Sequence, residues 1–306
     1  MHPTFGHLLG EPIPAYFVML VAGFAAAVFL AVRCARRLDI DQDLLIDLAL
    51  ICLVAGVAGA RILHVLADGY FWDYVHLCTD PTQVVWRTVA TQLECDQLGG
   101  RWNGGAHTCH PPGRDCFAWA KFWNGGLTYY GGLAGAVAAG SWFVVREGLP
   151  LWRVVDLAGL VTPLGIFFGR LGCFFAGCCF GVTTDSAIGL SFPPGSAASR
   201  KQFELQLLES KALASLPVHP SQLYEALGSL LIAIYLGLWG HPRKRFDGEV
   251  FCLSVGLYAA LRFALEFLRA DDRGSIAGWS TSQLVSVGLL LCVLPLWHRL
   301  SRRAPT

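Results

Sequence analysis

Long apolar stretches with few charged residues follow one another along most of the sequence. A helix needs about 20 mainly apolar residues to cross the hydrocarbon core of a bilayer, and several stretches reach or approach that length. The pattern predicts an all-α integral membrane protein with seven transmembrane helices. The predicted spans are Tyr16–Val32, Leu44–Leu66, Leu127–Val145, Val154–Gly172, Leu223–Trp239, Val250–Leu268 and Ser282–Trp297.

Composition supports this class of protein. Hydrophobic residues make up 54% of the 306 residues and charged residues only 15%, whereas soluble domains contain about 25% charged residues. The formal net charge of +1 gives no reason to expect nucleic acid as a partner. We therefore expect a single membrane domain over residues 1–306.

The basic residues between the predicted spans indicate the orientation. Those in the short connections and the C-terminal tail fall on one side of a seven-span arrangement. They are Arg33, Arg36, Arg37, Arg146, Arg153, Arg243, Lys244, Arg245, Arg299, Arg302 and Arg303. The positive-inside rule predicts that this side is cytoplasmic, with the N-terminus outside and the C-terminus inside. The first span has no basic n-region and no Ala-x-Ala site, so we expect it to be retained.

Two longer segments fall on the outer side, residues 67–124 and residues 182–217. The first contains Cys78, Cys95, Cys109 and Cys116. Cysteines in an oxidising compartment usually form disulfides, and we favour that interpretation, although the spacing leaves the pairing open. A zinc site with two nearby histidines is the alternative. The second segment contains FELQLLESKALASL (residues 203–216), whose spacing suits a short amphipathic helix.

Charged residues inside the predicted spans are the first candidates for function, because charge in a membrane is costly. Arg61, Arg170 and Arg262 lie within apolar stretches, and Glu266 lies four residues after Arg262 on the same helix face. Arg269 follows one turn later. Each arginine could instead anchor a helix end or form a structural ion pair. Several of them converging near the outer leaflet would form a site for a phosphate group.

Glycines gather at the start of the third predicted span, in WNGGLTYYGGLAG (residues 123–135). Part of this pattern is typical of close helix packing. The paired glycines, Gly131 and Gly132 among them, also suggest a bent entry into the membrane with Tyr129 and Tyr130 at the interface.

The fifth predicted span opens with HPSQLYEA (residues 219–226). A capped helix start with an interfacial tyrosine explains Pro220 and Tyr224. It does not explain His219, Gln222 and Glu225 together at the mouth of an apolar helix, so we favour a functional cluster.

The stretch GRLGCFFAGCCFG (residues 169–181) places Arg170 beside three cysteines. Glycines on either side of the arginine allow a ligand to approach closely. We interpret Cys173, Cys178 and Cys179 as small packing residues rather than as participants in chemistry.

These motifs together resemble the prolipoprotein diacylglyceryl transferase family. The resemblance runs from Tyr16 to the last span, outside the cysteine-rich insertion. It rests on YFVMLVAGF, GARILHVL, WNGGLTYYGGLAG, GRLGCFFAGCCFG, HPSQLYEA and YAALRFALEFLRADDRG.

The resemblance implies transfer of diacylglyceryl from phosphatidylglycerol to the lipobox cysteine of a prolipoprotein in the bacterial inner membrane, with release of glycerol phosphate. It assigns headgroup binding and phosphate stabilisation to Arg170 and Arg262. The further expected site residues are His219 and Tyr130 for catalysis, and Tyr16, Arg61, Gly131, Gly132, Gly181, Gln222, Tyr224, Glu225, Glu266 and Arg269 for substrate binding. No metal or other cofactor is expected.

The chain departs from the family pattern at three places. Cys173 stands where well-known members have asparagine, and Ala176, Gly177 and Cys178 replace Asn-Gly-Glu. Tyr130 stands where some members have a histidine proposed as the base, and a phenol with a pKa of about 10 is a poor base near neutral pH. His219 is the first candidate to replace it, followed by Glu225 or Glu266.

Two other functions stay open from the sequence. One is a paralogue that transfers lipid to a different acceptor. The other is a non-catalytic phospholipid-binding or thiol-redox membrane protein, favoured by the adjacent Cys178 and Cys179. The sequence leaves the oligomeric state undetermined.

Overall fold

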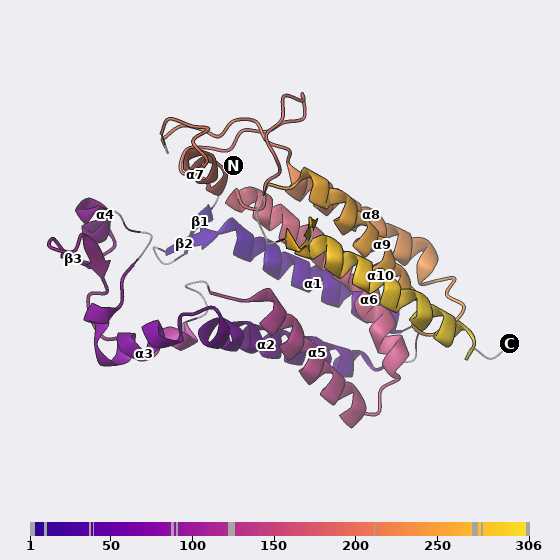
Figure 1. Ribbon diagram of the computed structural model, residues 1–306. Coiled ribbons are helices and arrows are strands. Elements are labelled where there is room, and N and C mark those ends of the chain that lie inside the picture. Colours follow the sequence, from indigo (N-terminus) through magenta and orange to yellow (C-terminus); the bar gives the residue numbers. More distant parts are fainter. Residues whose placement is uncertain are drawn as a thin grey trace. The chain divides into compact units, whose positions relative to one another are not determined.

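The chain forms two compact units in a computed structural model. The model describes residues 4–8, 11–36, 38, 40–86, 89, 91–121, 126–210, 212–270, 275–276 and 278–303. The first unit contains Met1–Leu45 and Leu149–Thr306, and the second contains Ile46–Gly148 (Figure 1). Trp123, Asn124 and Gly125 of the predicted glycine motif lie outside the described residues.

A helical bundle forms the first unit. Its long helices are α1 (Ala15–Ala35), α6 (Leu151–Ala176), α8 (Ser221–Tyr235), α9 (Glu249–Leu265) and α10 (Thr281–Ser301). A π-helical turn, η4 (Leu236–Gly240), continues α8. Helix α6 packs against α1, α8 and α9, while α10 packs against α9 (Figure 1). Helix α6 is therefore the central element of this unit.

Small residues allow these helices to approach one another closely. A Cβ on Gly159 of α6 would lie 2.6 Å from the Cα of Phe251 of α9, and one on Gly228 of α8 would lie 2.6 Å from Leu261. Van der Waals packing of this kind holds membrane helices together, because lipid supplies no hydrophobic force between them.

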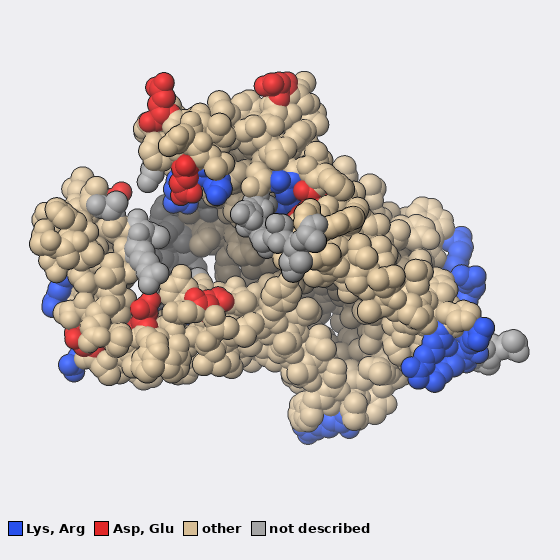
Figure 2. Space-filling view, viewed as in Figure 1, with Lys and Arg blue, Asp and Glu red and all other residues tan. Residues whose placement is uncertain are grey.

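One end of the first unit carries many of its basic side chains. Arg153 contacts Asp247 at 3.1 Å and also donates to the carbonyl of Leu38, while Lys244 contacts the fully buried Asp156 at 3.0 Å. Figure 2 shows Lys and Arg side chains gathered over the C-terminal end of α10. The loop between α8 and α9 thus meets the beginning of α6 at this end.

Asp156 of α6 also caps the N-terminus of helix α9. Its carboxylate accepts hydrogen bonds from the backbone N–H groups of Gly248 and Phe251, at 2.9 and 3.1 Å. A carboxylate at a helix N-terminus satisfies unpaired donors and interacts favourably with the helix dipole.

Shorter elements of the first unit lie away from this basic end. They are the hairpins β1 (Thr4–Leu8) with β2 (Glu11–Pro14) and β5 (Ser275–Ile276) with β6 (Trp279–Ser280), the helix α7 (Ala197–Glu204) and the 3-10 turn η5 (Glu266–Leu268). The expected helix over residues 203–216 is wrong for most of its length. The helix begins earlier, because Ser196 caps it through the N–H of Ser199, and it ends at Glu204.

The second unit pairs two long helices with a folded insertion. Its helices and turns are α2 (Gln42–Ala67, whose first turn belongs to the first unit), α3 (Phe71–Thr79), η1 (Pro81–Gln83), α4 (Gln92–Gln97), η2 (Ala118–Ala120) and α5 (Tyr129–Arg146). The strands β3 (Arg101–Asn103) and β4 (Thr108–His110) form an antiparallel hairpin.

Glycines join α2 to α5. A Cβ on Gly132 would lie 3.3 Å from the carbonyl oxygen of Gly56, and one on Gly131 would collide with the carbonyl of Gly59. The N–H of Thr128 donates to the carbonyl of Ala60 at 3.1 Å. The glycine pattern at this span therefore has a packing role.

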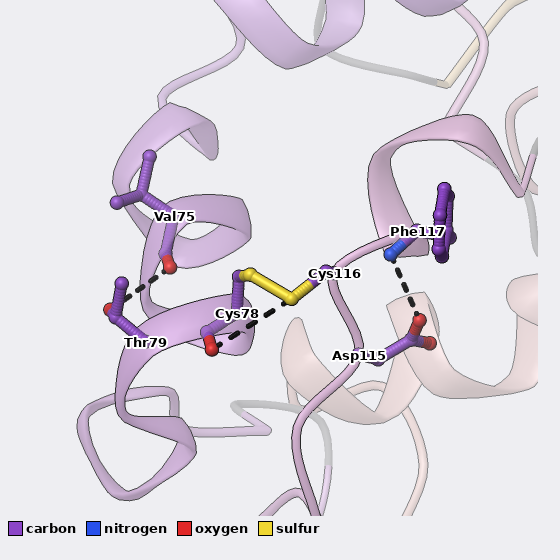
Figure 3. The surroundings of a disulfide bond; sticks show 6 residues. All are labelled: Val75, Cys78, Thr79, Asp115, Cys116 and Phe117. Carbon is purple, nitrogen blue, oxygen red and sulfur yellow. Dashed lines mark hydrogen bonds between the residues drawn. A yellow bond between two sulfur atoms is a disulfide. The ribbon is translucent and has the colours of Figure 1, made fainter.

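Two disulfides hold the insertion together, which confirms the prediction that its four cysteines form disulfides and supplies their pairing. Cys78 at the end of α3 bonds to Cys116, and Cys95 of α4 bonds to Cys109 of β4. Figure 3 shows the first bridge beside the turn in which Asp115 accepts a hydrogen bond from the N–H of Phe117. These four cysteines are therefore not free to bind zinc.

Six helical segments of the described residues are long and apolar enough to cross a membrane. They are Ala15–Ala35, Gln42–Ala67, Leu151–Ala176, Ser221–Gly240, Glu249–Leu268 and Thr281–Ser301. The protein is thus a multi-pass membrane protein. The predicted span Leu127–Val145 corresponds to α5, which is not among the six. Tyr129 and Tyr130 at one end and Arg146 at the other shorten its apolar part, so the seven-span topology stays a prediction.

Candidate functional site

A buried carboxylate in helix α8 lies at the centre of the site in the first unit. Glu225 is fully buried, and its Oε1 contacts Nη2 of Arg170 from α6 at 2.9 Å. The same oxygen accepts a hydrogen bond from the hydroxyl of Tyr258 of α9 at 2.7 Å. Its Oε2 lies 3.5 Å from Nη1 of Arg269, just after η5. One carboxylate thus contacts side chains from α6, from α9 and from the segment just after η5.

A second ion pair lies within the C-terminal part of the α9 segment. Nη1 of Arg262 contacts Oε2 of Glu266 at 2.5 Å, which confirms the predicted pairing of these two residues. Nη2 of Arg262 donates to the hydroxyl of Ser282 of α10 at 3.0 Å. The side chains of Arg262 and Glu266 are only 9% and 8% exposed.

The two groups together are rich in guanidinium side chains. Among the described residues, the ion pairs join three guanidinium groups, of Arg170, Arg262 and Arg269, to two carboxylates, of Glu225 and Glu266. Arg170 is the most accessible of the three, with 17% of its side chain exposed against 9% and 2% for the others. An anionic group that approaches this cluster meets Arg170 first.

Gly181 fixes the backbone around the cluster. Its N–H donates to the carbonyl of His219 at 2.9 Å, and the N–H of Val182 donates to the carbonyl of Leu268 at 3.0 Å. A Cβ on Gly181 would lie 2.7 Å from the carbonyl oxygen of His219 and would collide with that of Leu268. Glycine is therefore required for the three chain segments that carry the cysteines, His219 and Arg269 to meet.

The residues of HPSQLYEA support the loop that contains the cysteines. The hydroxyl of Ser221 donates to the carbonyl of Cys179 at 2.9 Å, and the amide of Gln222 donates to the carbonyl of Cys178 at 2.7 Å. Both side chains are almost completely buried. The Nδ1 atom of His219 lies 3.2 Å from the hydroxyl of Tyr224.

Tyr16 approaches the same site from the start of α1. A Cβ on Gly172 would lie 2.9 Å from its ring, so the glycine allows α1 to pack closely on α6. Tyr16 is 41% exposed and lies within electrostatic range of Arg170 and Cys173.

The three cysteines of the signature stretch are brought together by the end of α6. Cys173 lies in the last turn, and Gly177, with φ of 70°, ends the helix in the left-handed conformation. Cys179 also has a positive φ, of 60°. The Sγ atoms of Cys173, Cys178 and Cys179 all lie within 4.8 Å of one another. Sequence predicted packing residues here, whereas the structure places three thiols in one cluster.

Four predicted site residues belong to the second unit. The guanidinium of Arg61 donates to the carbonyls of Trp119, Ala118 and Gly126, at 2.6, 2.7 and 3.1 Å. Arg61 is 7% exposed and helps to line a cavity of about 720 Å³. Tyr130, at the beginning of α5, is 64% exposed, while Gly131 is buried and Gly132 partly buried against α2.

Asp68 connects the end of α2 with the beginning of α5 in this unit. Its Oδ2 contacts Nδ1 of His64 and accepts from the hydroxyl of Thr128, each at 2.8 Å. The hydrogen bond to His64, together with that from Thr128, lowers the pKa of the Asp68 carboxyl below its ordinary value.

Comparison with known proteins identifies the family. The model of a family described as prolipoprotein diacylglyceryl transferase matches residues 3–105 and 110–299. The chain belongs to the prolipoprotein diacylglyceryl transferase family. This confirms the resemblance inferred from the motifs, and it makes the protein a member of a family of membrane transferases.

Several relatives carry the family name over most of their length. The chain is 26% identical to phosphatidylglycerol–prolipoprotein diacylglyceryl transferase 2 of Clostridium perfringens (strain 13 / Type A), over 95% of this chain and 92% of the relative. It is 29% identical to the transferase of Xylella fastidiosa (strain M23), over 95% and 89%. It is 36% identical to that of Stenotrophomonas maltophilia (strain R551-3), over 60% and 65%.

In this diacylglyceryl transferase family member, the sequence pattern did not point to two polar residues that complete the cluster, Tyr258 and Ser282. Tyr258 precedes Arg262 by four positions and Glu266 by eight, so a search for polar residues on one helix face could have found it. Ser282 carried no signal, because it contacts Arg262 from another helix. Asp156, at the basic end of the unit and not in this cluster, also went unnoticed because it lies inside an apolar stretch.

Proposed function

We propose that the protein transfers diacylglyceryl from phosphatidylglycerol to the thiol of the lipobox cysteine of prolipoproteins, forming a thioether and releasing glycerol phosphate. The reaction takes place at the extracytoplasmic face of the bacterial inner membrane. The observation that carries this proposal is the convergence of Arg170 and Arg269 on the buried Glu225, with Arg262 on the neighbouring helix, in a chain that belongs to the transferase family.

The arginine cluster suits the phosphate of the lipid. A phosphodiester carries one negative charge, and guanidinium groups bind phosphate oxygens with directed, charge-assisted hydrogen bonds. Arg170 binds the headgroup, because it is the most exposed of the three. When the carbon–oxygen bond breaks, negative charge grows on the departing phosphate, and Arg170 and Arg262 stabilise it.

His219 is the base that we assign to the substrate thiol. Glu225 is held between two arginines and a tyrosine, and Glu266 is paired with Arg262, so both carboxylates are already engaged in contacts within the protein. His219 is half-buried, and its ring contacts a neutral hydroxyl, that of Tyr224. An imidazole has a pKa of about 6.5, which suits proton transfer near neutral pH.

The remaining expected site residues are proposed to bind the substrates. Tyr16 and Tyr224 contact the lipid or the signal peptide near the cluster. Gly181 and Gln222 hold the loop against which these substrates bind. Arg61, Gly131 and Gly132 of the second unit are also proposed to bind substrate, and Tyr130 of that unit to act in catalysis. The proposed topology has seven spans, with α5 as the third.

A transfer assay with purified protein tests this function. The protein in detergent is mixed with phosphatidylglycerol and a lipobox peptide, and glycerol phosphate and the lipidated peptide are measured. Arg170→Ala and Arg262→Ala each remove a hydrogen-bond donor that stabilises the developing negative charge on the phosphate. We expect transfer to fall by about 100- to 1,000-fold. His219→Ala is expected to lower it by about 100-fold.

Arg245→Ala is the matched control, because its side chain is 75% exposed at the basic end of the unit. We expect it to retain native activity. Absence of glycerol phosphate from the native protein, under conditions in which the Clostridium perfringens relative is active, would refute the proposed function.

A further inference from the structure

The cysteine cluster is a group of nucleophilic side chains to which the proposed reaction assigns no role. All eleven cysteines of the chain are described: four form the two disulfides, and seven are not disulfide-bonded. Cys173, Cys178 and Cys179 alone among the described residues form a group of three or more potential metal ligands. Each of the three is half-buried.

The spacing of the three thiols matches a metal site after a small adjustment. A zinc–sulfur bond of about 2.3 Å in tetrahedral geometry separates the sulfur atoms by about 3.8 Å. The observed separations are within 4.8 Å, so side-chain rotations suffice to bring the ligands into place.

The backbone of this cluster is fixed before any ligand binds. Gly177 reverses the chain after α6, and the carbonyls of Cys178 and Cys179 are held by Gln222 and Ser221. The amide oxygen of Gln222 is buried and has no hydrogen-bond partner within the described residues. A buried polar atom without a partner indicates that a water molecule, an ion or a ligand completes its surroundings.

The net charge of a metal complex at this position suits its surroundings, because Arg170 and Arg269 offset a negative charge there. Three thiolates with one divalent ion carry one net negative charge, and Arg170 and Arg269 lie within electrostatic range of Cys179. Thiolate ligands select soft cations over magnesium or calcium. Zinc sites with three protein ligands keep a fourth position open for substrate.

We propose that Cys173, Cys178 and Cys179 bind one zinc ion whose fourth position receives the thiol of the lipobox cysteine. This inference rests on the proposed transfer reaction and adds a way to activate the nucleophile. A thiol bound to zinc is deprotonated, whereas a free thiol with a pKa of about 8.5 is only about 3% thiolate at pH 7.

The step balances without an oxidant or a reductant. The lipobox thiol binds zinc and its proton passes to His219. The sulfur lone pair then forms a bond to the terminal glyceryl carbon, while the bond between that carbon and the phosphate oxygen breaks. The electron pair leaves with the glycerol phosphate, held by Arg170. The thioether product is neutral and leaves the metal.

Metal content is the first test and does not depend on activity. Protein purified without chelator is analysed by elemental mass spectrometry, and we expect one zinc ion per chain. Cys173→Ser, Cys178→Ser and Cys179→Ser should each lose the zinc, while Cys292→Ser, an exposed free cysteine of α10, should retain it. Cobalt exchanged into the native protein should show thiolate charge-transfer absorption that the same three variants lack.

Transfer activity then separates this inference from the proposed function. Native protein stripped of metal should lose transfer by about 30-fold at pH 7, and added zinc should restore it. Transfer at the native rate by metal-free protein, or by the three serine variants, overturns the zinc site and leaves the proposed function standing. A disulfide among the three cysteines in the native protein, shown by five rather than seven titratable thiols after unfolding, overturns it as well.

Discussion

At the scale of single residues, Glu225 organises the charged cluster. Removing two arginines and a carboxylate from water is costly, and their attraction offsets the cost only while the contacts are complete. Glu225 supplies both oxygens to these contacts, to Arg170 and to Arg269, and it also accepts from Tyr258. Loss of its charge therefore leaves two guanidinium groups without their carboxylate.

Glu225→Gln tests this dependence. The amide keeps the shape of the side chain but removes the charge, so we expect the free energy of unfolding in mixed micelles to fall by about 3–5 kcal/mol. Glu147→Gln is the control, because that carboxylate forms a surface pair with Arg146 and should cost no more than about 1 kcal/mol. Equal effects of the two changes would show that the buried contacts do not stabilise the protein.

At the scale of elements, the site depends on three segments that meet at Gly181. The segment after α6 carries the cysteines, the segment before α8 carries His219, and the segment after η5 carries Arg269. Backbone hydrogen bonds join all three. The helices therefore supply the charged side chains, while the connecting segments set their spacing.

Gly181→Ala tests whether the three segments must approach one another closely at this residue. The added methyl group collides with two carbonyls, so the segments must separate. Overpacking of this kind costs about 1–3 kcal/mol. We expect transfer to fall along with the thermal midpoint.

Gly165→Ala in α6 is the control, because a Cβ there meets open space. Alanine is favoured over glycine in a helix by about 1 kcal/mol, so this change should preserve activity and stability. If Gly181→Ala behaves like Gly165→Ala, the close approach is not required.

At the scale of the whole molecule, the number of spans decides on which sides the two termini lie. Within the first unit, the basic residues beside the ends of α1 and α10 and the beginnings of α6 and α9 fit one cytoplasmic face. Helix α5 is the element that determines whether the total is six or seven.

Accessibility of the termini tests the seven-span topology. A protease site at the N-terminus should be cleaved from outside in intact spheroplasts, and one at the C-terminus only after the membrane is permeabilised. The N-terminal site serves as the control for protease access, and a cytoplasmic marker reports leakage. Termini on the same side would show an even number of spans and would exclude α5 as a complete crossing.

The sequence by itself determined the class of protein, most of the membrane helices and the family. Hydrophobicity over a span length is a local property, and six quoted motifs carry the family resemblance, so both can be read from the order of residues. The pairing of Arg262 with Glu266 was also predictable, because four residues on one helix fix their proximity.

Tertiary structure alone decided how the site is assembled. Arg170, Tyr258 and Arg269 meet at Glu225 because helix packing brings α6, α8 and the α9–η5 region together, and no local pattern encodes that contact. The same holds for the disulfide pairing and for the three thiols. Cys178 and Cys179 approach Cys173 because Gly177 reverses the chain and Gln222 and Ser221, more than forty residues later, hold it there.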